Sequence, residues 1–156
     1  MTHSTRILLA VGAGLAWLAA LVTDWMTLHG AQVQMEGFGG PSEMVAPFGI
    51  PVSAHSGAVS FAGATLDLWL VVAAGGLGSL LAGYRAVGLD RLPRAVPLGI
   101  VGLATLFTGS AWLAAVDPGA TLGPGLVAAS VGSVLGCVLA LVPDADGSTK
   151  VRTSAA

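Results

Sequence analysis

Four long apolar segments constrain the fold of this chain more than any other feature of its sequence. They cover residues 7–28, 66–84, 95–116 and 122–142. Each is close to the roughly 20 residues that a helix needs to cross a hydrocarbon core of about 30 Å. Backbone groups in lipid must be hydrogen-bonded within the segment, so we expect four helices. The sequence therefore predicts an all-α membrane protein, a four-transmembrane-helix bundle, with residues 1–142 as a single domain.

The composition supports a membrane protein. Apolar residues make up 54% of the chain and charged residues only 9%, whereas soluble domains carry roughly 25% charged residues. So apolar a surface could not be kept in water. The net charge of -2 gives no basis for nucleic-acid binding. The one cysteine, Cys137, lies inside the fourth segment, and we expect it to be a small packing residue.

The basic residues predict an orientation. All six fall on one side of the four segments: Arg6, Arg85, Arg91, Arg94, Lys150 and Arg152. By the positive-inside rule that side is the cytoplasm. We expect a multi-pass protein of the plasma (inner) membrane with cytoplasmic termini, a flexible cytoplasmic tail over residues 143–156, and Trp25 as an interfacial anchor. A cleaved signal peptide over the first segment is the alternative, because Arg6 precedes an apolar core.

The outer loop, residues 29–65, is the longest stretch that cannot lie in a bilayer. Its glycines and prolines exclude a long helix. Residues 31–36 alternate apolar and polar types, as a strand does, and residues 37–42 have the composition of a turn. Val59 and Phe61 alternate with polar or small residues and suggest a partner strand. We expect a small β-hairpin or sheet, with an irregular loop as the alternative.

Two carboxylates flank this loop, Asp24 and Asp67. We expect them near each other at its base, either as a cation or proton site or, as we favour, as helix-end carboxylates among lipid headgroups. With His29 and His55 they are candidates for a zinc or copper site. The histidines form no H-x-x-x-H or H-x-E pattern, so the sequence predicts neither a metal site nor a cofactor.

Small residues recur every four positions in three of the segments. Such stripes let helix backbones approach closely inside lipid, where the hydrophobic effect does not drive association. The predicted helix-packing residues are Gly12, Ala16, Ala20, Ala74, Gly78, Ala82, Ala128, Gly132, Gly136 and Ala140. A second row, Gly75, Ser79 and Gly83, runs beside the second stripe. The stripes predict a compact bundle, and their partner is either a sister helix or another protein.

Catalytic motifs are absent from the sequence. It has no serine-hydrolase, zincin or CxxC pattern, and its glycine pairs lack the Lys-Ser/Thr of a phosphate loop. The sequence therefore predicts a non-enzymatic protein that docks a partner membrane protein, or a second copy, as a structural or accessory subunit. Its helices and outer loop would make the contacts, with loop residues Val33, Met35, Phe38 and Phe48 as anchors.

Two alternatives stay open for the function. A small transporter or channel component would carry a pathway between the helices, although no ionisable residue lies in the middle of a segment. A metal-binding membrane protein would use the loop histidines and carboxylates.

The layout resembles the uncharacterised small four-span integral membrane proteins of high-GC bacteria. In that group a Trp after the first span and Gly-rich later helices recur, as in residues 23–25 and 123–126 here. In topology alone the chain is similar to claudin-like proteins, whose first outer loop forms a sheet. The claudin Trp and paired-Cys signature is missing, so that resemblance implies a layout and supplies no functional residues.

Overall fold

Four helices account for most of the structure, a computed structural model that describes residues 2–29, 32–37, 40–45, 49–86, 93–116 and 119–142. They are α1 (His3–Val22), α2 (Leu68–Ala86), α3 (Ala95–Ala115) and α4 (Pro124–Leu141). Their 20, 19, 21 and 18 residues are long and apolar enough to cross a membrane, at about 27–32 Å each. The prediction of four helices with the length and apolar character of membrane spans is confirmed.

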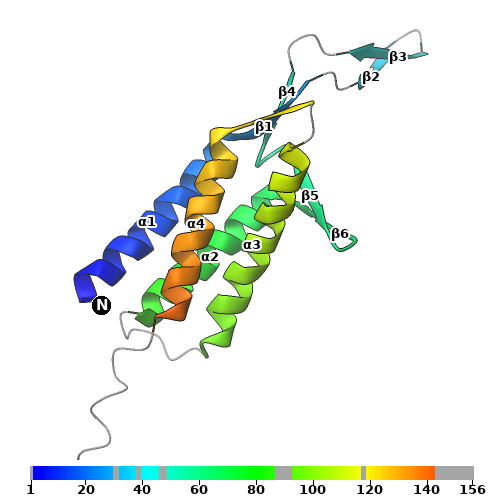
Figure 1. Ribbon diagram of the computed structural model, residues 1–156. Coiled ribbons are helices and arrows are strands. Elements are labelled where there is room, and N and C mark those ends of the chain that lie inside the picture. Colours follow the sequence, from blue (N-terminus) through cyan, green and yellow to red (C-terminus); the bar gives the residue numbers. More distant parts are fainter. Residues whose placement is uncertain are drawn as a thin grey trace, which may run out of the picture.

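The helices form a bundle in which α2 and α4 each pack against all three other helices, while α1 and α3 lie on opposite flanks (Figure 1). The beginning of α1 and the end of α4 lie at one end of the bundle, here called the tail end. The strands gather at the other end, here called the sheet end. The arrangement brings the long loop together with the connection between α3 and α4.

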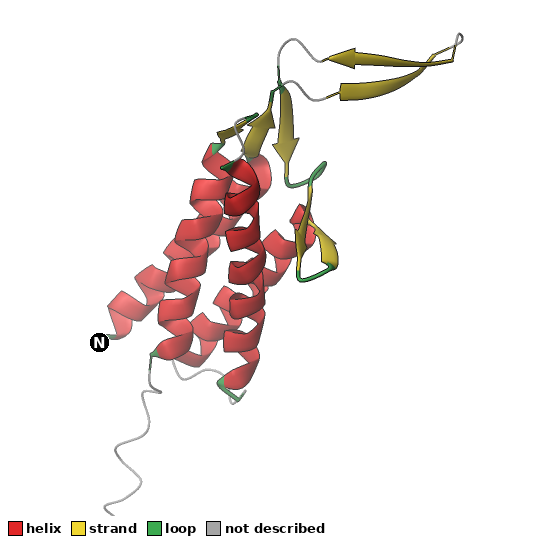
Figure 2. Ribbon diagram, turned by 45° about the vertical axis from the view of Figure 1, so that its right-hand side comes forward, coloured by secondary structure: helices red, strands yellow, loops and turns green. Residues whose placement is uncertain are grey.

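Three small sheets correct the all-α class (Figure 2). The first has the order β4-β1-β7 and joins β1 (Asp24–Leu28) to β4 (Ile50–Ser53) and β7 (Ala120–Leu122), all antiparallel. The other two are hairpins, β2 (Gln32–Gly37) with β3 (Gly40–Val45), and β5 (Ala58–Phe61) with β6 (Ala64–Asp67). The described part of the long loop therefore contains strands and is not irregular throughout.

The ends of the predicted spans need correction. The first was expected over 7–28, but α1 ends at Val22 because Thr23 is extended, with φ -116°, and donates from both its amide and its hydroxyl to Ala19 O, at 3.1 and 2.6 Å. The second was expected from residue 66 and the fourth from residue 122, where β6 and β7 lie instead. Apolar content alone does not separate a helix end from an adjoining apolar strand.

The expected pairing of the first loop strand with the strand at Val59 is wrong. Residues of β2 pair with β3, as in Val33 with Met44, and Val59 of β5 pairs with Leu66 of β6. Closing a short connection costs less chain entropy than closing a long one, which favours the local partner. In the second hairpin Ala62 and Gly63 have φ of 49° and 83°, the type I′ turn that suits two-residue hairpins.

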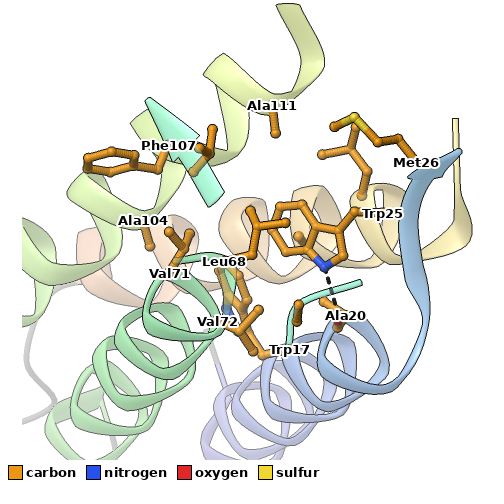
Figure 3. Packing of buried hydrophobic residues seen from close by; sticks show 14 of the residues in the cluster. Trp17, Ala20, Trp25, Met26, Leu68, Val71, Val72, Ala104, Phe107 and Ala111 are labelled. Atoms are coloured by element: carbon orange, nitrogen blue, oxygen red, sulfur yellow. Dashed lines mark hydrogen bonds between the residues drawn. The ribbon is translucent and has the colours of Figure 1, made fainter. Parts of the chain in front are cut away.

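The core near the sheet end is built on Trp25 (Figure 3). Trp25 is 0% exposed, and its Nε1 donates to Ala20 O at 2.8 Å. Met26 is buried as well, although neighbouring strand residues normally face opposite sides. A register irregularity between Asp24 and Met26 in the β1–β4 ladder allows both side chains to face inward. The prediction of Trp25 as an interfacial anchor is therefore wrong.

Candidate functional site

A cavity at the sheet end has a volume of about 720 Å³ and lies between the three-stranded sheet, β5 and α3. Buried apolar side chains form much of its lining, among them Met26, Val59 and Leu68, while His29 and Ser60 are exposed at its rim. Phe61 packs edge-on against Phe107 of α3, with ring centroids 6.0 Å apart. The β5–β6 hairpin is thereby held against α3 and forms one wall of the cavity.

The two candidate histidines lie at different cavities. His29 lines the cavity just described, donates its amide to Gly119 O at 2.5 Å, and places Nε2 3.3 Å from Thr121 Oγ1. His55 lines a separate groove between α1 and α2. The two histidines therefore do not line a common cavity.

The two candidate carboxylates belong to different sheets. Asp24 pairs with Ser53 in the β1–β4 ladder and Asp67 with Ala58 in the β5–β6 hairpin, and both side chains are exposed. Within the described ranges no group of three His, Cys, Asp or Glu residues could hold a metal ion. His29, His55, Asp24 and Asp67 therefore form no three-ligand site among the described residues.

The predicted loop anchors lie on or beside the β2–β3 hairpin. Val33 and Met35 are on β2, opposite Met44 and Ser42 of β3. Phe38 and Phe48 lie outside the described residues. The hairpin extends beyond the ends of the helices in Figures 1 and 2, and its two strands make their contacts chiefly with each other.

Trp17 of α1 occupies a notch made by two glycines, a feature that the sequence analysis missed. A Cβ on Gly75 of α2 would overlap the indole ring, and one on Gly132 of α4 would lie 2.9 Å from Nε1. The ring is 2% exposed. The sequence did contain a signal for this contact: Trp17 directly follows Ala16 of the α1 stripe, and the second and fourth segments are rich in glycine.

The predicted stripes face sister helices. A Cβ on Gly136 would lie 2.5 Å from Ser79 Oγ, and one on Gly78 would lie 2.8 Å from Val101 Cγ2. Gly12 is closest to Leu135, at 3.4 Å. The remaining stripe residues divide into two groups: Ala20, Ala82 and Ala140 are buried, and Ala16, Ala74 and Ala128 are half-buried.

Besides Arg6 Nε at the tail end, three buried polar atoms have no hydrogen-bond partner within the described part of the chain: Trp17 Nε1, Ser79 Oγ and Ser133 Oγ. The first two lie against the glycine stripe of α4. A buried polar group without a partner costs about 1–3 kcal/mol, so such atoms stand out as possible contacts for a polar ligand.

Two arginines close helix ends at the tail end. Arg6 at the start of α1 donates from Nη1 to Ala86 O, the last residue of α2, at 2.5 Å. Arg94 donates from Nε to Ala140 O at 3.0 Å and from Nη2 to Leu141 O, at the end of α4. The terminal carbonyls of a helix lack partners within the helix and carry partial negative charge. Arg6 therefore links α1 to the end of α2, and Arg94 links the start of α3 to the end of α4.

Comparison of the chain with protein-family models, with curated proteins and with solved structures gave no match.

Proposed function

We propose that this chain is a non-enzymatic, multi-pass integral membrane protein that docks a partner membrane protein as a structural or accessory subunit. Four helices long and apolar enough to cross a membrane support its placement in a bilayer. Leu8, Leu15 and Val22 on α1 are 71%, 61% and 76% exposed, as side chains facing lipid would be. The positions of the six basic residues favour the plasma membrane, with the tail end cytoplasmic and the sheet end outside.

The β2–β3 hairpin is the observation that carries the docking proposal. A two-stranded hairpin is marginally stable by itself in water. This one extends past the helices, and its strands pair with each other and not with the remaining sheets. The outer edge of each strand offers backbone donors and acceptors to a further strand. A partner protein that pairs with such an edge would stabilise the hairpin and gain a specific contact.

The decisive experiment removes the hairpin and keeps everything else. Leu28 pairs with Ile50 in the β1–β4 ladder, so His29 and Gly49 lie at the two ends of a strand pair. Residues 30–48 can therefore be replaced by Asn-Gly, which closes two antiparallel strands in a type I′ turn. We expect a membrane protein to copurify stoichiometrically with the full chain in mild detergent. The shortened protein should keep its thermal stability there and lose this copurifying protein.

Point variants provide the controls for that experiment. Val33→Ser should weaken recovery of the partner, whereas His29→Ala with His55→Ala should leave it unchanged. Unaltered recovery of the partner by the shortened protein would show that the hairpin is not the docking element. Loss of a stoichiometric metal in the histidine variant would favour a metal-binding protein instead.

A second candidate function is a small transporter or channel component. The unpartnered polar atoms of Trp17, Ser79 and Ser133 inside the bundle favour it, because a polar solute passing between the helices would satisfy them. Flux of a polar solute into liposomes containing the purified chain tests this candidate. Transport would be supported by flux that Ser79→Ala with Ser133→Ala reduces, and opposed by flux equal to that of empty liposomes.

A further inference from the structure

A second hollow lies on the flank of the bundle, in the groove between α1 and α2. Its volume is about 530 Å³, within the roughly 300–1,000 Å³ of ligand sites. Leucines from both helices form its sides, and it reaches His55 and Trp69 at the sheet end. It is separate from the cavity beside β5, which has no lining residue in common with it.

We propose that this groove holds one acyl chain of a phospholipid from the outer leaflet, with the lipid headgroup beside His55 and Trp69. The proposal rests on the proposed placement of the four helices in a membrane, with the sheet end outside. It does not depend on the docking role of the hairpin.

Missing side chains create the space for the acyl chain. Gly14 and Gly76 line the groove from opposite helices. A Cβ on Gly14 would meet nothing within 4 Å, and one on Gly76 would only touch Trp17 Cβ at 3.8 Å. Neither glycine is required for helix contact, in contrast to Gly75, where the Trp17 ring fills the position of a Cβ. Glycine at these two positions leaves an open apolar slot next to the core.

The length of the groove favours an acyl chain over a transmembrane helix. Its lining on α2 runs from Trp69 to Leu80, about 16 Å at 1.5 Å per residue. One leaflet contributes about 15 Å of a hydrocarbon core of about 30 Å. On α1 the lining runs from Leu21 only as far as Gly14. A partner helix would cross both leaflets, whereas the lining of this groove ends at Gly14 on α1 and at Leu80 on α2, short of the tail end of both helices.

The polar end of the groove is suited to a lipid headgroup. Trp69 is 45% exposed at the first turn of α2, and tryptophan is enriched at membrane interfaces. His55 is exposed beside it and can donate a ring N–H to a phosphate or ester oxygen. Among the described residues that line the groove, His55 has the only titratable side chain. The acyl chain should therefore contribute more to binding than the headgroup charge does.

Filling the groove tests the proposal. The full-length protein in mild detergent is titrated with dipalmitoyl phosphatidylethanolamine, and the lipid-bound fraction is measured by native mass spectrometry. Gly14→Leu and Gly76→Leu each place a side chain in the slot and should lower the bound fraction severalfold. The control is Gly109→Leu, on the exposed face of α3, where a Cβ would also meet nothing within 4 Å. It should bind lipid like the unaltered chain.

The outcomes separate a bound lipid from other occupants. Equal lipid retention by all three variants, with unchanged melting temperatures, would show that the lipid is not held in the groove and would overturn the proposal. Loss of a protein partner or of a dimer in Gly76→Leu, with lipid retention unchanged, would assign the groove to a helix and overturn it as well. Release of the chain from membranes by alkaline carbonate would instead refute the proposed placement in the bilayer.

Discussion

Trp17 is the residue on which the packing of three helices depends. Its indole ring reaches from α1 into the notch formed by Gly75 of α2 and Gly132 of α4. We expect Gly132→Leu to destabilise the protein by about 1–3 kcal/mol, because the added side chain must displace the ring from a filled core. Gly136→Leu should cost a similar amount, since a Cβ there would already lie 2.5 Å from Ser79 Oγ. Thermal unfolding in detergent measures both effects.

A matched control comes from the same helix. Val134 lies between the two glycines and is 63% exposed, so Val134→Leu should change stability by no more than about 0.5 kcal/mol. Leu135 would be a poorer control, because its Cδ1 packs against Gly12. Equal melting temperatures for all three variants would mean that the glycine stripe of α4 faces lipid.

At the residue scale, the sequence identifies the small residues at helix contacts but not the side chains that pack against them. The recurrence of glycine and alanine marks the faces of α2 and α4 that are buried. It does not reveal that one tryptophan occupies the notch. Trp25 illustrates the same limit. A tryptophan at the end of an apolar segment has the composition of an interfacial anchor, yet Trp25 lies on the strand β1 that follows the helix, and its ring is fully buried in the core.

Among the elements, the β5–β6 hairpin offers a direct test through its turn. Ala62 has a φ of 49°, which a residue with a Cβ adopts at a cost, and Gly63 follows with a φ of 83°. Ala62→Asn would create the Asn-Gly pair that a type I′ turn prefers. We expect it to stabilise the hairpin by a few tenths of a kcal/mol to about 1 kcal/mol. Hydrogen exchange of the β5 and β6 amides measures the change.

A second substitution at Ala62 should have the opposite effect on the stability of the hairpin. A β-branched residue disfavours a positive φ more strongly than alanine does. Ala62→Val should therefore speed amide exchange in β5 and β6 and leave exchange in α1 unaffected. Faster exchange in the Asn variant than in the unaltered chain would rule out the type I′ geometry at this turn.

Apolar length predicts the helices as elements but not their ends. Each of the four segments overlaps one helix, because only a helix of about 20 apolar residues satisfies its own backbone in lipid. The sheet β4-β1-β7 could not be predicted from apolar length, because its three strands lie far apart in the chain. The short strand β7 in particular has no recognisable pattern and is defined by its pairing with β1.

For the whole molecule, the basic residues carry two kinds of information. Arg6 and Arg94 close the ends of α2 and α4 through carbonyl contacts, a role that would favour arginine there whichever way the protein faces. The same residues contribute to the positive-inside argument. Arg6 and Arg94 are therefore weaker evidence for the orientation than their positions alone indicate, and a direct measurement of the orientation is needed.

Labelling of single cysteines settles the orientation. The only native cysteine, Cys137, lies within α4 with Sγ 3.7 Å from Thr105 Oγ1, so Cys137→Ser gives a conservative background. Ser42→Cys places a thiol on β3, and Gly88→Cys places one in the connection between α2 and α3. If the tail end is cytoplasmic, an impermeant maleimide should label the first in whole cells and the second only after lysis. Labelling in the opposite order would put the hairpin in the cytoplasm, and the partner would then have to be sought on that side of the membrane.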